Sequence, residues 1–335
     1  MKLTPAKGTR FPLLWNVAAV ACLCLSMSVS SPAQETAGKP GTASSTAPAN
    51  ARGFSTPQQA AEVLIAAAEK FDEVALFQIF GPAGEDIVFS GEYAQDRQHA
   101  ANFVAEAREK NSISVDPSGG KRAFLLVGDE DWPFPVPLVK KGEQWFFDSK
   151  AGRQELLYRR IGANELDAIA ICRGYVEAQH EYALRPHEGY EVNQYAQRII
   201  SSPGKQDGVA WQNPDGTWGG PVGDKIARAI EQGYTGGEPY HGYFFKVLKG
   251  QGPEAPGGEI DFMVGGAMIG GFGLAAAPAE YRVTGVMTFM VGPDGVVYEK
   301  DLGADTLKIF QSMDKYNPDK TWEVTEDDVE DDSQD

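Results

Sequence analysis

The feature that most constrains the fold is a helical pattern of apolar residues between Asn164 and Leu184, followed by strand-forming segments. Apolar side chains recur there at intervals of three, four or seven residues, namely Leu166, Ile169, Cys172, Val176 and Ala183. Charged residues occupy the opposite face. Such a helix is stable in water mainly when its apolar stripe is buried against another element. We therefore expect it to pack on an antiparallel sheet formed by the last third of the chain.

The segment after residue 240 has the signals of that sheet. Short β-rich stretches separated by turn residues lie at Tyr243–Leu248, Ile260–Val264, Phe272–Ala277, Val286–Val291 and Val296–Lys300. Residues 185–240 are expected to be mostly loop, with one short helix near Asp224–Gln232. We predict a C-terminal α+β domain over residues 162–322 and a disordered acidic tail over residues 323–335.

A second α+β domain is predicted over residues 53–161. Thr56, Pro57 and Gln59 have the spacing of a helix start with a capping box. Further helices are expected at Glu92–Lys110 and Ser149–Arg160, with a short strand at Ile87–Phe89. Four segments are typical of an antiparallel meander, namely Ile113–Val115, Ala123–Val127, Val136–Lys140 and Gln144–Phe147. The predicted fold is therefore N-terminal helices on a small antiparallel sheet.

The first residues have the pattern of a secretory signal peptide. Three basic residues precede an apolar run from Phe11 to Leu25, and small residues follow as far as Ala33. We predict a cleavable signal peptide over residues 1–33 and a flexible linker over residues 34–52. Cys172 is then the only cysteine, so no intramolecular disulfide is expected. The predicted location is periplasmic or extracellular, with no transmembrane segment after cleavage.

The charge of the chain restricts its partners. The formal net charge is −17, and 42% of the residues are hydrophobic. The excess of negative charge repels phosphate backbones, so we predict that the protein does not bind nucleic acid. The apolar content is enough for two buried cores.

One histidine lies where catalysis is plausible from the sequence. Tyr240, His241 and Gly242 stand at the entrance to a predicted strand, where loops often carry function. One interpretation is a hydrolase acting on envelope glycan or peptide, with His241 as general base and Asp224 or Glu238 as its partner. The other is a histidine that only bonds the backbone at a tight turn.

Metal and cofactor sites are not predicted. His180 and His187 flank Glu181, but their spacing matches no zinc pattern such as His-Glu-x-x-His. No phosphate-binding or dinucleotide-binding loop occurs in the context that it requires. We therefore predict neither a metal nor a cofactor.

Two tryptophans suggest a ligand site. Trp211 and Trp218 bracket a polar loop, where aromatic rings either stack on sugars or peptides or pack the loop onto the sheet. The candidate ligand-binding residues are Trp211, Trp218, Tyr240 and His241. The leading interpretation is a non-enzymatic binding or envelope-assembly module for an envelope protein or a glycan. A structural spacer without a pocket is the third alternative.

The order of elements resembles known families. Asn164–Gln179, Gly242–Phe245 and Thr284–Tyr298 together resemble the globular part of type IV pilins and pseudopilins, a helix laid on an antiparallel sheet. The helix starts much later than a pilin's assembly helix and is only half apolar. Residues 54–322 more closely resemble the bacterial secreted family catalogued as domain-of-unknown-function family 2950, most specifically in Tyr240–Lys246 and Val297–Gly303. That resemblance implies secretion and no particular activity.

Overall fold

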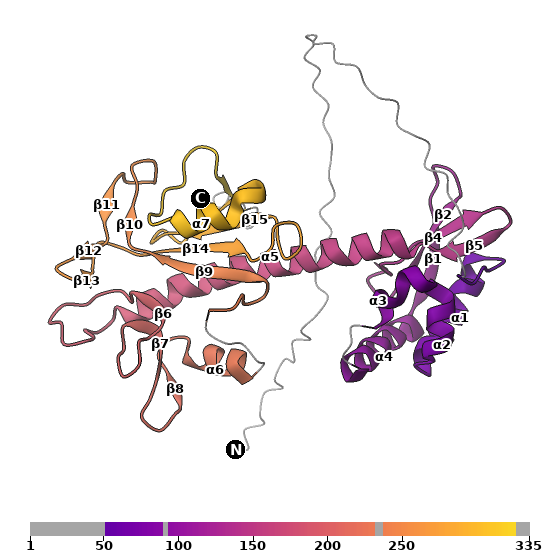
Figure 1. Ribbon diagram of the computed structural model, residues 1–335, viewed down its shortest axis with the longest axis horizontal. Helices are drawn as coiled ribbons and strands as arrows, with labels where there is room; N and C mark the ends of the chain where they lie inside the picture. Colours follow the sequence, from indigo (N-terminus) through magenta and orange to yellow (C-terminus); the bar gives the residue numbers. More distant parts are fainter. Residues whose placement is uncertain (1–50, 90–92, 232–236, 326–335) are drawn as a thin grey trace, which may run out of the picture. The chain divides into compact units, whose positions relative to one another are not determined.

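The computed structural model describes residues 51–89, 93–231 and 237–325. The predicted signal peptide, most of the predicted linker and the tail beyond Thr325 lie outside these residues. The chain divides into two compact units between Arg159 and Arg160. Both units combine helices with antiparallel strands, so the predicted α+β class is confirmed (Figure 1). Within the described ranges, no helix has the length and apolar character needed to cross a membrane.

The first helices of unit 1 begin at side chains that satisfy free backbone N–H groups. Thr56 Oγ1 accepts a hydrogen bond from the backbone N–H of Gln59 at 3.1 Å and caps α1 (Pro57–Glu69). Asp72 caps α2 (Glu73–Phe80) in the same way, at 3.0 Å. The predicted start of the first helix is therefore confirmed, whereas α2 was not predicted.

The predicted strand at Ile87–Phe89 is wrong. Glu85 and Asp86 occupy the first turn of a short helix there, where the helix dipole favours negative charge. The remaining helical segments of this part are η1 (Pro82–Gly84), α3 (Glu85–Val88) and α4 (Tyr93–Glu109).

The sheet of unit 1 has the order β1-β2-β4-β5, with β3 paired to β2. Its strands are β1 (Asn111–Val115), β2 (Arg122–Val127), β3 (Trp132–Pro133), β4 (Leu138–Lys141) and β5 (Gln144–Phe147). Leu64 of α1, Ile79 of α2 and Leu125 of β2 are almost completely buried in one core with Phe147. The predicted helices on a small antiparallel sheet are thus confirmed.

One helix, α5 (Ser149–Tyr182), replaces two predicted ones. The second predicted helix began at Asn164, but Asn164 lies inside α5 and its side-chain amide donates to the backbone oxygen of Thr284 at 2.8 Å. Gly162 lies inside the helix and costs about 1 kcal/mol relative to alanine. No proline interrupts this stretch, so the backbone hydrogen bonds continue through it.

The main sheet of unit 2 is antiparallel and has the order β17-β16-β15-β14-β9. Its strands are β9 (Tyr243–Leu248), β14 (Gly273–Pro278), β15 (Met287–Val291), β16 (Val297–Asp301) and β17 (Glu323–Val324). Disorder was predicted from Glu323 onward, and for Glu323 and Val324 this is wrong because β17 pairs with β16. Thr325 beside them is only 2% exposed.

The buried stripe of α5 joins the core of this sheet. Ile169, Cys172 and Val176 share one hydrophobic cluster with Tyr243 and Phe289 of the sheet. The predicted packing of a helix on antiparallel strands is confirmed. The stripe begins later than predicted, since the side chain of Leu166 is 43% exposed.

The segment predicted as mostly loop contains a small sheet. It is formed by β6 (Arg198–Ile200), β7 (Gly208–Gln212) and β8 (Trp218–Gly219), with β6 parallel to β7. The helix predicted near Asp224–Gln232 is confirmed by α6 (Gly223–Glu231), which contacts β7 and β8. Unit 2 also contains β10 (Gly250–Gln251), β11 (Ile260–Asp261), β12 (Met263–Val264), β13 (Ala267–Met268), η2 (Gly303–Asp305) and α7 (Thr306–Ser312). In Figure 1, α7 lies beside β14.

Candidate functional site

The predicted ligand-binding residues fall in two separate places of unit 2. Tyr240 and His241 lie in the turn that leads into β9 of the main sheet. Trp211 and Trp218 lie on β7 and β8 of the small sheet. The four residues therefore do not form one site.

Residues 240–243 form a two-residue hairpin turn. The backbone N–H of Tyr240 donates to the oxygen of Tyr243 at 2.8 Å, and that of Tyr243 donates back at 3.0 Å. The φ angles of His241 and Gly242 are +48° and +74°, as a type I′ turn requires. A side chain on Gly242 would lie 2.6 Å from Asn164 Nδ2, so glycine is needed here for space as well as for φ.

Polar side chains of α5 hold the neighbouring backbone. Glu165 Oε1 accepts hydrogen bonds from the backbone N–H groups of Val286 and Met287 at 2.8 and 3.0 Å. Asn164 bonds the oxygen of Thr284 in the same segment. The helix therefore fixes the chain just before β15, directly beside the His241 turn.

His241 is paired with a carboxylate of the same helix. Its Nδ1–H donates to Asp167 Oδ2 at 2.5 Å, and the two side chains are 35% and 48% exposed. This hydrogen bond raises the pKa of His241 above its ordinary 6.5, while partial burial opposes the rise. The sequence pointed instead to Asp224 or Glu238, and the structure replaces them with Asp167.

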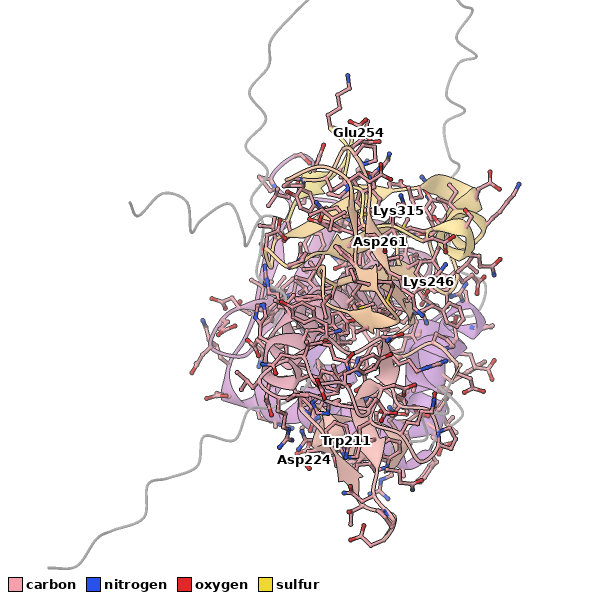
Figure 2. All side chains as sticks on the ribbon, turned by 90° about the vertical axis from the view of Figure 1, so that its left-hand side faces the viewer. Trp211, Asp224, Lys246, Glu254, Asp261 and Lys315 are labelled. Carbon is pink, nitrogen blue, oxygen red and sulfur yellow. The ribbon has the colours of Figure 1, made fainter. Side chains whose placement is uncertain are left out.

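Trp211 is a packed residue rather than an open platform. Its side chain is 7% exposed, whereas Trp218 is half-buried. A Cβ added to Gly220 would lie 2.8 Å from Trp211 Cζ3, and one added to Gly219 would lie 2.8 Å from its Nε1. Two glycines thus let the backbone lie against the indole. In Figure 2, Trp211 and Asp224 lie in the β7–α6 part of the unit.

A hollow of about 360 Å³ lies between the end of α5 and the β7–β8 hairpin. Its volume is near the lower end of the range of about 300–1,000 Å³ for small-molecule sites. It is lined by Glu181, Tyr182, Leu184, Arg185, His187, Trp211, Gly220 and Pro221. Of the predicted binding residues, it contains Trp211.

Two stacked rings form part of the lining. The rings of Tyr182 and His187 are 3.8 Å apart and 15° from parallel, and His187 lies 6.0 Å from Trp211. His187 Nε2 is 2.9 Å from the backbone oxygen of Tyr182. A carbonyl oxygen only accepts, so this ring nitrogen is the donor. His187 is 6% exposed and is therefore held in one orientation.

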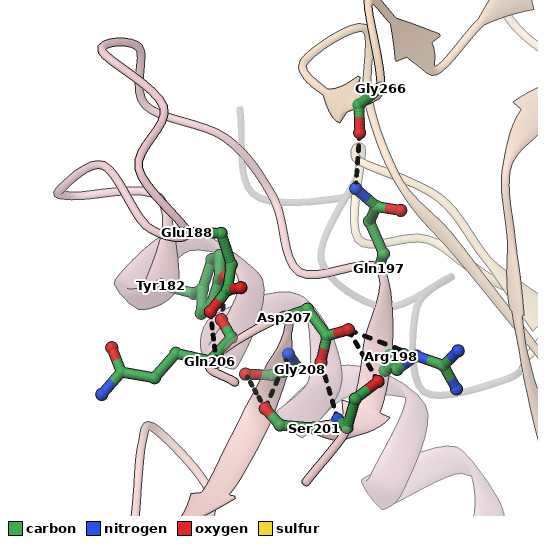
Figure 3. A network of polar contacts seen from close by, with 10 residues as sticks. Tyr182, Glu188, Gln197, Arg198, Ser201, Gln206, Asp207, Gly208 and Gly266 are labelled. Carbon is green, nitrogen blue, oxygen red and sulfur yellow. Dashed lines mark hydrogen bonds and ion pairs between the residues drawn. The ribbon is translucent and has the colours of Figure 1, made fainter. Parts of the chain in front are cut away.

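The loop that bounds the hollow is tied down by polar contacts (Figure 3). Tyr182 Oη donates to the backbone oxygen of Gln206, and Glu188 Oε1 accepts from its N–H at 2.5 Å. Asp207 accepts from the backbone N–H of Ser202 at 2.7 Å. On the helix side, the amide of Gln179 both donates to and accepts from the backbone of Ala196, at 2.8 and 2.7 Å. The hollow therefore exists before any ligand binds.

Groups suited to metal binding or nucleophilic attack are scarce in the described chain. Within its three described ranges, no three side chains of His, Cys, Asp or Glu lie together as a metal site would need. Cys172 is completely buried, and burial raises the pKa of its thiol to about 12. A thiol with that pKa stays protonated near neutral pH, so it is not a reactive nucleophile.

Comparison with protein families identifies the chain at family level. The model of a family described as protein of unknown function (DUF2950) matches residues 51–325. The chain belongs to the DUF2950 family. We found no significant match among curated proteins or among solved structures, so the likeness to pilins has no support from these comparisons. The DUF2950 match covers the described parts of both units and assigns no activity.

The His241–Asp167 pair of this DUF2950 protein predicts a pH response. Asp167→Asn is expected to lower the pKa of His241, because it removes the carboxylate that stabilises the protonated ring. In the unchanged protein the folded-state pKa is raised above 6.5. The pair's contribution to stability is therefore complete below the unfolded-state pKa and is lost as the pH rises through the folded-state pKa. NMR titration of the imidazole signals measures the shift.

The control for this prediction is Asp224→Asn, which removes the exposed carboxylate that the sequence suggested. This variant should leave the pKa of His241 unchanged. An equal pKa in the Asp167→Asn variant and the unchanged protein would show that the pair does not form in solution.

Proposed function

We propose that the chain is an exported, non-enzymatic binding protein of the cell envelope and that the hollow beside Trp211 holds its ligand. The single observation that carries the proposal is this hollow, about 360 Å³ in volume and bounded by rings held in fixed orientations. The surface of the hollow is more polar than apolar, so it suits a small polar ligand. The export part of the proposal rests on the signal-peptide pattern of residues 1–33.

The polar network supports binding without a large change of shape. The contacts of Gln179, Tyr182 and Glu188 hold the 185–207 loop before a ligand arrives. A preorganised site loses less conformational entropy on binding than a site that must first order a loop. This favours a module whose task is recognition.

Blocking the hollow tests the proposal. Leu184 lines it and is 77% exposed, so Leu184→Trp is expected to fill the hollow while leaving the core unchanged. Calorimetric titration with two small probes, chitobiose and dialanine, is expected to detect binding of at least one of them. Leu184→Trp should then weaken that binding at least about tenfold, since the indole occupies the ligand volume.

The matched control is Val192→Trp, because Val192 is 50% exposed and does not line the hollow. It should bind the probe as the unchanged protein does. Absence of binding for both probes, or equal binding by the Leu184→Trp variant, would contradict the proposed site.

A hydrolase is the second candidate function, and the His241–Asp167 pair favours it. A carboxylate that accepts from Nδ1 fixes the tautomer and orientation of a catalytic histidine. The raised pKa of His241 works against it as a general base, because the unprotonated ring is the active form. Unchanged turnover of envelope glycan and peptide substrates by a His241→Gln variant would remove this candidate, and loss of turnover would support it.

A further inference from the structure

Two opposite charges at the rim of the hollow are not neutralised by the protein. Glu181 and Arg185 both line the hollow and are both exposed. Among the described residues, neither side chain makes an ion pair or a hydrogen bond. The nearby Arg198, by contrast, is paired with Asp207 at 3.5 Å. The two rim charges are therefore free to interact with a ligand.

The end of helix α5 adds to the negative charge of Glu181. Glu181 belongs to the last turn of α5, which ends at Tyr182. The C-terminal end of a helix carries a partial negative charge, so this side of the hollow favours a cation. Arg185 lies beyond the helix end, and its planar guanidinium matches the geometry of a carboxylate. Glu181 thus favours an amine and Arg185 a carboxylate.

From this arrangement we infer that the ligand carries both an amine and a carboxylate, as a free amino acid or a short peptide with unblocked ends does. This inference rests on the proposed function, since it names the ligand class of the same hollow. The ammonium group pairs with Glu181 and the carboxylate with Arg185. The part between them contacts the apolar lining at Leu184 and Pro221. A hollow of about 360 Å³ suits a molecule of this size.

A neutral sugar is the alternative ligand that must be distinguished from an amino acid or short peptide. A neutral sugar in the hollow leaves Glu181 and Arg185 without charged partners. Specificity then depends on the difference between the two affinities, and hydrogen bonds between charged groups are roughly twice as strong as neutral ones. The charges therefore select the zwitterion.

The test compares three forms of one dipeptide by calorimetric titration of the purified protein. Dialanine has both charges, N-acetyl-dialanine lacks the ammonium group, and dialanine amide lacks the carboxylate. Dialanine is expected to bind at least about tenfold more tightly than either blocked form, because each blocked form loses one charge-assisted hydrogen bond.

Two variants that each remove one charge show which residue causes the preference for dialanine. Glu181→Gln should bind dialanine and N-acetyl-dialanine equally, and Arg185→Gln should bind dialanine and dialanine amide equally. The controls are Glu177→Gln and Lys205→Gln, since Glu177 and Lys205 are exposed and do not line the hollow. Both controls should keep the full preference for dialanine.

The outcomes separate this inference from the proposal on which it rests. If all three forms bind equally and Leu184→Trp weakens their binding, the hollow binds ligands without distinguishing their charges. In that case the inference is overturned and the proposed function stands. The same holds if chitobiose binds and dialanine does not. If neither probe binds, the inference and the proposed function fail together.

Discussion

Burial of one face of α5 against the antiparallel sheet is the interaction on which the structure of unit 2 depends. Ile169, Cys172 and Val176 lose contact with water there, together with residues of β9 and β15. Full burial of an aliphatic side chain of this kind contributes about 1.5–3 kcal/mol. No disulfide supplements this core, because Cys172 is a free thiol. The packed helix therefore provides the frame for both candidate sites.

The same helix supplies the polar groups of those sites. Asn164, Glu165 and Asp167 hold the backbone before β15 and the His241 turn. More than three helical turns further along, Gln179 and Tyr182 hold the loop that bounds the hollow. A rigid element that positions side chains at two places along its length gives precise sites. The hollow and the histidine pair are thus consequences of one packing arrangement.

The sequence predicted the helices and strands better than it predicted the tertiary contacts between them. The bounds of β9 were predicted because turn residues flank an apolar run, and those of β5 for the same reason. The helix start predicted at Asn164 was wrong, because the local sequence does not distinguish an asparagine inside a helix from one at its start. The partner of His241 was missed because Asp167 is 74 residues away and only tertiary packing brings the two together. The hollow was missed for the same reason, apart from Trp211.

Native-state hydrogen exchange of α5 tests the central claim most directly. If the stripe is buried as described, the amides of residues 169–182 exchange only through unfolding of the whole unit, because opening the helix exposes its core. Their free energy of opening should then equal the free energy of global unfolding measured in urea. Exchange of these amides as fast as those of the exposed turn at residues 213–217 would contradict the account.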